Sequence, residues 1–284
     1  MTKQASVIGS YQELWHRLTA VYDDREAKAV AQWLLDTAFG LSMADVLCDG
    51  LARLTPAEHE RLELMVARLE QGEPVQYVVG KADFCGRQFH VEPGVLIPRP
   101  ETAELCRWIV ADTSQSAPAI LDIGTGSGCI AVTLALDIPD SRVTAWDISE
   151  PALRIARQNA ATAGATVALE RCDALCPTAF APWDIIVSNP PYIYSKERAA
   201  MTRNVLDYEP REALFAPDDN PLLFYQRIAD YARRTLTPGG CLYFELNPLL
   251  ADAVGDYLQR CGLRQPQIRE DQFGKRRFIK ANQP

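Results

Sequence analysis

The sequence predicts an α/β protein with a mostly parallel sheet covered by helices on both faces, preceded by a small helical domain. From Ala119 onward, short apolar segments alternate with helical ones, which is typical of parallel strands joined by crossover helices. A glycine-rich turn follows the first of these strands. Before residue 75, by contrast, apolar residues recur only at helical spacing. At 284 residues the chain is long enough for one large domain and one small one.

Residues 1–75 are predicted to form the helical domain. Between Arg25 and Gly40, apolar residues recur every three to four positions, and the glycine is a stop signal. A second helix is expected to begin at Thr55, because Thr55 and Glu58 can form a capping box around a proline at the first helical position. Gly72 is expected to end this helix, and its buried face is predicted to comprise Leu62, Met65, Val66 and Leu69.

Residues 76–100 are predicted to be a β-hairpin that links the helical domain to the rest of the chain, because Gly86, Pro93 and Gly94 interrupt an apolar stretch. Residues 101–284 are the predicted α/β domain, and ligands in such a sheet bind beyond the carboxyl ends of the strands. The expected strands are 119–122, 143–147, 167–170, 184–188, 241–245, 267–269 and 277–280, and the expected helices include 151–163 and 222–236.

Composition and charge narrow the classes of function. The net charge of −8 offers no basic field for a phosphate backbone, which argues against nucleic-acid binding. No apolar run approaches the roughly 20 residues that a membrane span needs, and residues 1–5 do not begin a signal peptide. Of the eight cysteines, the closest pair, Cys172 and Cys176, lacks a second pair or a nearby histidine. We therefore expect a cytoplasmic protein with reduced thiols, no membrane segment and no metal site.

The first candidate ligand site is the turn that follows the strand at 119–122. Its glycines let the backbone turn sharply and approach a ligand, and the N–H groups at the start of the next helix favour an anionic group. Position 129 is Cys129, so the third glycine of the dinucleotide pattern G-x-G-x-x-G is absent. A tight turn without a ligand is the alternative. The residues of the turn are Gly124, Thr125, Gly126, Ser127 and Gly128.

Two acidic residues follow the next two strands. Asp147 ends the second strand, where a carboxylate can accept hydrogen bonds from both hydroxyls of a ribose. It can also cap the following helix, although Ser149 is better placed to do so. Asp173, followed by Ala174, comes after the third strand and can reach an adenine amino group, with a solvated loop aspartate as the alternative. These residues predict an adenosine-type ligand without distinguishing NAD from S-adenosylmethionine.

The feature that separates these two cofactors is the run Asn189, Pro190, Pro191 and Tyr192 after the fourth strand. The lone pair of a planar NH₂ group is delocalised, so a site that methylates it must hold both N–H bonds and turn the nitrogen toward the methyl donor. The Asn189 side-chain oxygen and the Pro190 carbonyl can accept those bonds, and Asn189 is also expected to contact the cofactor. The prolines stiffen the loop and Tyr192 offers a flat surface. A plain turn is the alternative.

At these residues the chain resembles the class I methyltransferases of planar nitrogens, which share Asn/Asp-Pro-Pro-Tyr and act on DNA adenine, RNA guanine or protein glutamine. Residues 72–77, 91–102, 209–214 and 271–277 narrow the resemblance to the release factor glutamine methyltransferase family (HemK/PrmC type). The similarity extends over nearly the whole chain from Gly72. The sequence departs from the family pattern at 217–222 and at 247–248, outside the cofactor and amide motifs.

The resemblance implies a Rossmann-like class I methyltransferase fold with S-adenosyl-L-methionine as cofactor and no metal. It implies methylation of the side-chain amide N5 of the glutamine in the GGQ motif of peptide chain release factors, with the helical domain docking that protein. By position, residues 124–128 hold the methionine end of the cofactor, Asp147 the ribose, and Asp173 and Ala174 lie by the adenine. Residues 189–192 bind the glutamine amide. The alternatives are a ribosomal protein glutamine, a nucleic-acid amino group, an NAD-dependent oxidoreductase and a catalytically silent scaffold.

Overall fold

The computed structural model describes residues 8–178 and 180–284, so residues 1–5, considered above for a targeting signal, lie outside it. The chain forms two compact units by its internal contacts. The first comprises Met1–Lys81 and Thr202–Tyr208, and the second Ala82–Met201 and Glu209–Pro284. No helix in the described part of the chain is long and apolar enough to cross a membrane.

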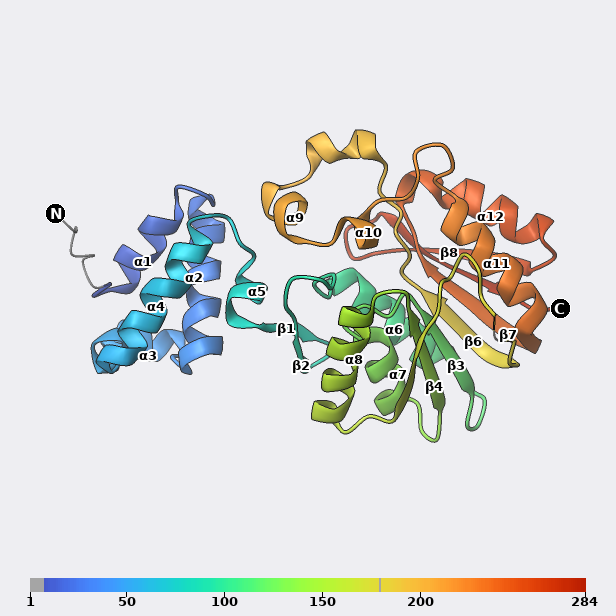
Figure 1. Ribbon diagram of the computed structural model, residues 1–284, viewed down its shortest axis with the longest axis horizontal. Helices are drawn as coiled ribbons and strands as arrows, with labels where there is room; N and C mark the ends of the chain where they lie inside the picture. The colour runs from blue at the N-terminus through green and yellow to red at the C-terminus, as the bar shows by residue number, and fades with distance from the viewer. Residues whose placement is uncertain (1–7, 179) are drawn as a thin grey trace. The chain divides into compact units, whose positions relative to one another are not determined.

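The first unit is built from helices, as predicted (Figure 1). The helix expected between Arg25 and Gly40 is α2, and Gly40 caps its end with a left-handed φ of 67°. Thr55 and Glu58 form the predicted capping box of α4, and the predicted face of that helix is buried. The helix ends before Gly72, at Leu69. The elements are α1 (Tyr11–Leu18), α2 (Asp24–Phe39), α3 (Met43–Leu47), the 3₁₀ turn η1 (Gly50–Arg53), α4 (Pro56–Leu69) and α5 (Val75–Val79).

A short helix from the middle of the chain, α9 (Arg203–Tyr208), belongs to the same unit. The Tyr208 hydroxyl donates to the carbonyl of Gln71 at 3.1 Å, and the Asn204 amide donates to the Tyr22 hydroxyl at 3.4 Å. Both contacts join residues more than a hundred positions apart in the chain, which periodicity does not indicate. The predicted hairpin is present but confined to β1 (Lys81–Phe84) and β2 (Arg87–His90).

The second unit holds a seven-stranded sheet in the order β5-β4-β3-β6-β7-β9-β8. All pairs are parallel except those that β9 makes with β7 and β8. After β3 the chain adds β4 and β5 on one side and then continues with β6 on the other side of β3. The strands confirm the prediction: β3 (Ala119–Ile123), β4 (Arg142–Asp147), β5 (Val167–Arg171), β6 (Trp183–Ser188), β7 (Leu236–Glu245), β8 (Arg264–Glu270) and β9 (Arg276–Asn282).

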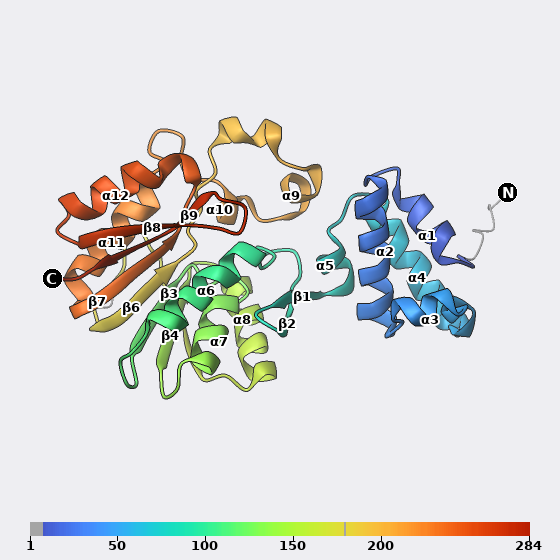
Figure 2. The same ribbon diagram turned by 180° about the vertical axis from the view of Figure 1, so that it is seen from behind.

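Alternate residues of each strand face different helices, which accounts for the apolar character of the central strands. In β3, Leu121 and Ile123 pack in a cluster with α11 (Leu223–Thr235) and α12 (Ala251–Arg260). Ile120 packs on the other face with α6 (Pro100–Asp112) and α7 (Cys129–Asp137). Figures 1 and 2 show these two helical layers, with α8 (Glu150–Ala163) beside α7. The short elements are η2 (Ser195–Ala200), α10 (Arg211–Leu214) and η3 (Pro248–Leu250).

Candidate active site

The candidate site lies where the order of strands reverses, at the carboxyl ends of β3, β4 and β6 (Figure 1). Ile123 is in register with Trp146 of β4 on one side and with Ser188 of β6 on the other. The residues that follow these three are Gly124, Asp147 and Asn189, so the three loops beyond these strand ends are neighbours. A reversal point of this kind leaves a crevice between neighbouring loops, where open α/β sheets bind ligands.

The glycine-rich loop is held mainly through its backbone. The N–H groups of Gly124 and Thr125 both donate to the carbonyl of Trp146, at 2.8 and 2.9 Å. Gly124 and Gly126 have φ values of 76° and 54°, and no described atom lies within 4 Å of where a Cβ would stand on either. The loop therefore leaves its backbone accessible, which fits a ligand that approaches closely.

The third glycine of the loop has a packing role. A Cβ on Gly128 would lie 3.0 Å from the Cβ and 3.1 Å from the Cα of Ala156 in α8, and its φ is 81°. The buried Asn159, also in α8, donates to the carbonyl of Ser127 at 2.8 Å. Asn159 also exchanges two hydrogen bonds with the backbone of His90 at the end of β2. The close approach of α7 to α8 and this amide hold the loop against the hairpin.

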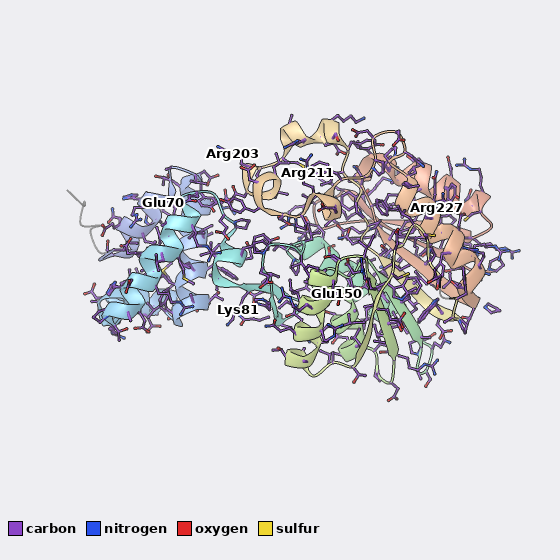
Figure 3. The ribbon with its side chains drawn as sticks, viewed as in Figure 1. Glu70, Lys81, Glu150, Arg203, Arg211 and Arg227 are labelled. Carbon is purple, nitrogen blue, oxygen red and sulfur yellow. The ribbon has the colours of Figure 1, made fainter. Side chains whose placement is uncertain are left out.

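Asp147 supports the glycine-rich loop and is not the cap of the next helix. One of its oxygens accepts from the N–H of Gly126 at 2.9 Å, and the other accepts from the N–H of Ser149 at 2.9 Å. Ser149 itself caps α8, whose exposed first residue, Glu150, is labelled in Figure 3. Burial raises the pKa of Asp147, and backbone donors, those of Ser149 and Gly126 foremost, oppose the rise. Each carboxylate oxygen has a second lone pair for a further donor.

Asp173 lies next to Asp147 along the sheet edge, since the N–H of Cys172 donates to the Asp147 carbonyl at 3.0 Å. The Asp173 carboxylate accepts from the N–H of Leu175 at 2.8 Å and so stabilises its own turn. Ala174 packs against the core cluster that contains α11. The contact of Asp173 and Ala174 with an adenine stays a prediction.

The loop after β6 is held through side chains. The amide nitrogen of Asn189 donates to the hydroxyl of Thr102 in α6 at 3.3 Å. The Tyr192 hydroxyl donates to Glu245 at 3.0 Å, and the Tyr192 carbonyl accepts from the Asn247 side chain at 3.1 Å. Asn189 is half-buried while Pro190 is buried, so the asparagine is the member of this pair with the more accessible side chain.

Two residues behind this loop are absent from the sequence-based site. The Thr102 hydroxyl donates to Glu245 at 2.6 Å, and both side chains are almost completely buried. Burial raises the pKa of Glu245, whereas hydrogen bonds from Thr102 and Tyr192 and the charge of Arg277 favour its carboxylate. Glu245 ends an apolar strand, as Asp147 does, and that shared position is the signal by which it could have been found.

Asp122 is a second buried carboxyl, at the end of β3 under the glycine-rich loop. The Thr125 hydroxyl donates to one of its oxygens at 2.7 Å. The other oxygen has no hydrogen-bond partner within the described part of the chain. Burial raises the pKa of Asp122 to about 7, so this group holds a proton well above the usual range of an aspartate.

Comparison with known proteins decides the family. The PrmC N-terminal domain matches residues 11–80, and the Methyltransferase small domain matches residues 106–214. A release factor glutamine methyltransferase of Bacteroides thetaiotaomicron is 44% identical, over 93% of this chain and 96% of its own. Its counterpart in Flavobacterium psychrophilum is 36% identical, over 93% of this chain and 95% of its own. The chain belongs to the release factor glutamine methyltransferase family.

Solved structures agree with the fold expected of this family. A methyltransferase from Pyrococcus furiosus is 17% identical with a TM-score of 0.52, over 80% of this chain and 98% of that one. A Thermus thermophilus 16S rRNA N2 G1207 methyltransferase, in complex with AdoMet and guanosine, is 20% identical with a TM-score of 0.52, over 72% and 50%. The predicted class I methyltransferase fold is confirmed, and so is the predicted family.

Proposed function

We propose that this enzyme transfers a methyl group from S-adenosylmethionine to the side-chain amide N5 of the glutamine in the GGQ motif of peptide chain release factors. Family membership supports the reaction, since relatives similar over nearly their whole length are named release factor glutamine methyltransferases. The single observation that supports it within the site is the orientation of Asn189. Its amide nitrogen is engaged by Thr102, which leaves its side-chain oxygen as an acceptor for substrate N–H.

The loops at the sheet edge suit the cofactor. We assign its methionine end to residues 124–128, its ribose to Asp147, and its adenine to Asp173 and Ala174. The open space over Gly124 and Gly126 supports the first assignment. The remaining lone pairs of the Asp147 carboxylate support the second. When bound, S-adenosylmethionine supplies a methyl group that its sulfonium has already activated.

Residues 189–192, the loop after β6, form what we call the acceptor loop. This loop has to position the glutamine amide, which is a weak nucleophile. In this proposal the Asn189 oxygen and the Pro190 carbonyl each accept one N–H of the glutamine amide, so the nitrogen presents its face to the methyl group. The same two oxygens stabilise the positive charge that grows on the nitrogen, and the proton leaves late, to water. Pro190 and Pro191 restrict the loop, and Tyr192 lies against the amide plane.

The remaining parts of the proposal concern partner and location. The helical first unit, which matches the PrmC N-terminal domain, is proposed to dock the release factor. We propose a cytoplasmic location, where release factors act on ribosomes. Direct binding of nucleic acid is not expected, because the net charge is −8.

The test is transfer of labelled methyl from S-adenosylmethionine to purified release factor. Three other possible acceptors are tested beside it: a release factor with Gln→Ala in its GGQ motif, ribosomal protein and duplex DNA. Label on the wild-type release factor alone supports the reaction and the modified residue. Label on ribosomal protein or DNA in its place would overturn the proposed substrate. Label on the Gln→Ala factor would show that another residue is modified.

A further inference from the structure

Three side chains from three elements form one hydrogen-bonded chain behind the acceptor loop. Asn189 follows β6, Thr102 is in the first turn of α6, and Glu245 ends β7. The Asn189 amide nitrogen donates to the Thr102 hydroxyl at 3.3 Å, and that hydroxyl donates to Glu245 at 2.6 Å. Thr102 is 3% exposed and Glu245 is 2% exposed, so water does not replace these partners.

The direction of this chain follows from the number of hydrogens that each group carries. A carboxylate only accepts, whereas a hydroxyl has one hydrogen to donate and lone pairs to accept. Because the Thr102 hydrogen points to Glu245, the Thr102 oxygen can only accept from Asn189. The Asn189 atom that faces Thr102 must therefore be its NH₂. The two ends of a carboxamide have nearly the same shape, so hydrogen bonding and not packing selects the orientation.

Glu245 also holds the other end of the acceptor loop. Its second oxygen accepts from the Tyr192 hydroxyl at 3.0 Å, so one buried carboxylate receives donors from both sides of the site. Burial raises the pKa of Glu245, and the positive charge of Arg277 in β9, together with the two donors, favours its carboxylate. Thr102 is held in place in turn, because Arg99, just before α6, is paired with the buried Glu209 at 2.5 Å.

We infer that Thr102 and Glu245 are positioning residues that orient the Asn189 amide, so that its oxygen and not its nitrogen faces the methyl acceptor. This inference rests on the proposed function. The site then selects a planar group that offers N–H bonds, such as a glutamine amide. It disfavours the isosteric glutamate, which offers only oxygens. Neither residue touches the substrate; both act through Asn189.

The first arm of the experiment removes the hydroxyl and keeps the shape. Thr102→Val is compared with Thr102→Ser, which retains the hydroxyl, and with Glu245→Gln, which accepts at only one of its two terminal atoms. Thr133→Val is the matched control, because the Thr133 hydroxyl in α7 is buried without a hydrogen-bond partner in the described residues. Turnover and KM for release factor, cofactor affinity and thermal unfolding are measured for each variant.

Thr102→Val is expected to lower kcat by about 10- to 100-fold, the range seen when outer-shell partners of a functional ligand are removed, whereas Glu245→Gln, whose amide oxygen can still accept from Thr102, is expected to lose less. Their cofactor affinity is expected to stay within about twofold of wild type, because neither residue reaches the glycine-rich loop. Thr102→Ser and Thr133→Val are expected to retain most of the activity. Unchanged kcat in Thr102→Val would overturn the inference, as would a loss fully explained by reduced folding or weaker cofactor binding.

The second arm measures the preference of the enzyme for glutamine over glutamate, which would not change if Thr102 had a merely structural role. The affinities of each variant for wild-type release factor and for a factor with Gln→Glu in its GGQ motif are compared. In Thr102→Val the Asn189 amide is free to turn its NH₂ toward the site, so the preference for glutamine over glutamate is expected to fall about tenfold. An unchanged preference contradicts the inference. If the wild-type enzyme fails to methylate the factor, the proposed function fails and the inference fails with it. If the wild-type enzyme is active and Thr102→Val is equally active, the inference alone fails.

Discussion

The glycine-rich loop and the acceptor loop begin at neighbouring strand ends, yet different parts of the protein hold them. The backbone of the glycine-rich loop donates to the carbonyl of Trp146 and to Asp147, both from the adjacent strand. The acceptor loop depends on two side chains from other elements. These are Thr102 of α6 and Glu245 of β7, the strand beside β6. A loop that binds through its backbone needs support for the backbone, whereas a loop that binds through an amide side chain needs other side chains to orient that amide.

The two loops also differ in the buried carboxyl that lies behind each. Both oxygens of Glu245 accept a hydrogen bond, from Thr102 and from Tyr192. Asp122 accepts one, from Thr125, and its other oxygen has no partner in the described residues. Burial raises the pKa of both carboxyls, but Glu245 has a donor on each oxygen, which favours its charged form and lets it orient those donors, whereas Asp122 has a single side-chain donor. The carboxyl that orients therefore belongs to the loop that we assign to the substrate.

The largest expected effect comes from Asn189→Ala, which removes the oriented amide itself. It is expected to lower kcat by about 100- to 1,000-fold, as loss of one preorganised transition-state contact does elsewhere. Cofactor affinity, measured by calorimetry, is expected to change much less. Asn282→Ala, at the end of β9, is the control and should keep wild-type activity. Equal losses of kcat and cofactor affinity would remove Asn189 from its assigned role.

The sequence predicted the first of these loops well because its parts lie at the ends of strands. Alternation of apolar strands and helices predicts parallel neighbours, and parallel neighbours bring Gly126 and Asp147 to the same edge. The structure joins them at 2.9 Å. The buried face of α4 was predictable for a similar reason, since its spacing is local.

The support of the acceptor loop could not be predicted in this way. Thr102 and Glu245 are 143 residues apart, and they meet because α6 packs against the sheet where β7 lies beside β6. Periodicity shows that a strand exists but not which strand lies next to it. The same limit hid Tyr208, whose contact with Gln71 places α9 in the first unit.

The next largest effect concerns pH and the unsatisfied Asp122. Its pKa is about 7 in the folded protein, against an ordinary value of 3.8, so between about pH 4 and 7 the folded state holds a proton that the unfolded state has lost. Stability therefore falls as pH rises through this window, by at most about 1.4 kcal/mol per pH unit for one proton. Asp122→Asn mimics the protonated form and should flatten the dependence. Urea unfolding of both proteins from pH 5 to 8 measures it, and parallel curves would contradict the assignment.

The packing of the glycine-rich loop is tested by Gly128→Ala, with Gly164→Ala as its control. Both glycines have left-handed φ values, 81° and 71°, so both substitutions strain the backbone. Only at position 128 does the new Cβ meet another atom, Ala156 at 3.0 Å, whereas position 164 is open. Gly128→Ala is expected to lose about 1–3 kcal/mol more unfolding free energy than the control. Equal losses in urea unfolding would show that the contact between α7 and α8 contributes nothing.

The smallest expected effect is that of Asp147→Ala, which tests whether the glycine-rich loop binds the cofactor while the acceptor loop binds the substrate. Asp147→Ala removes the acceptors for the N–H groups of Gly126 and Ser149, and it removes the carboxylate that we assign to the ribose. Cofactor affinity is expected to fall about tenfold, equivalent to roughly 1.4 kcal/mol. Turnover at saturating cofactor should stay near wild type, because the acceptor loop has its own supports. Asp147→Asn, which keeps one acceptor, should lie between the two. If Asp147→Ala lowers kcat at saturation and leaves the dissociation constant unchanged, the loops do not divide cofactor and substrate between them.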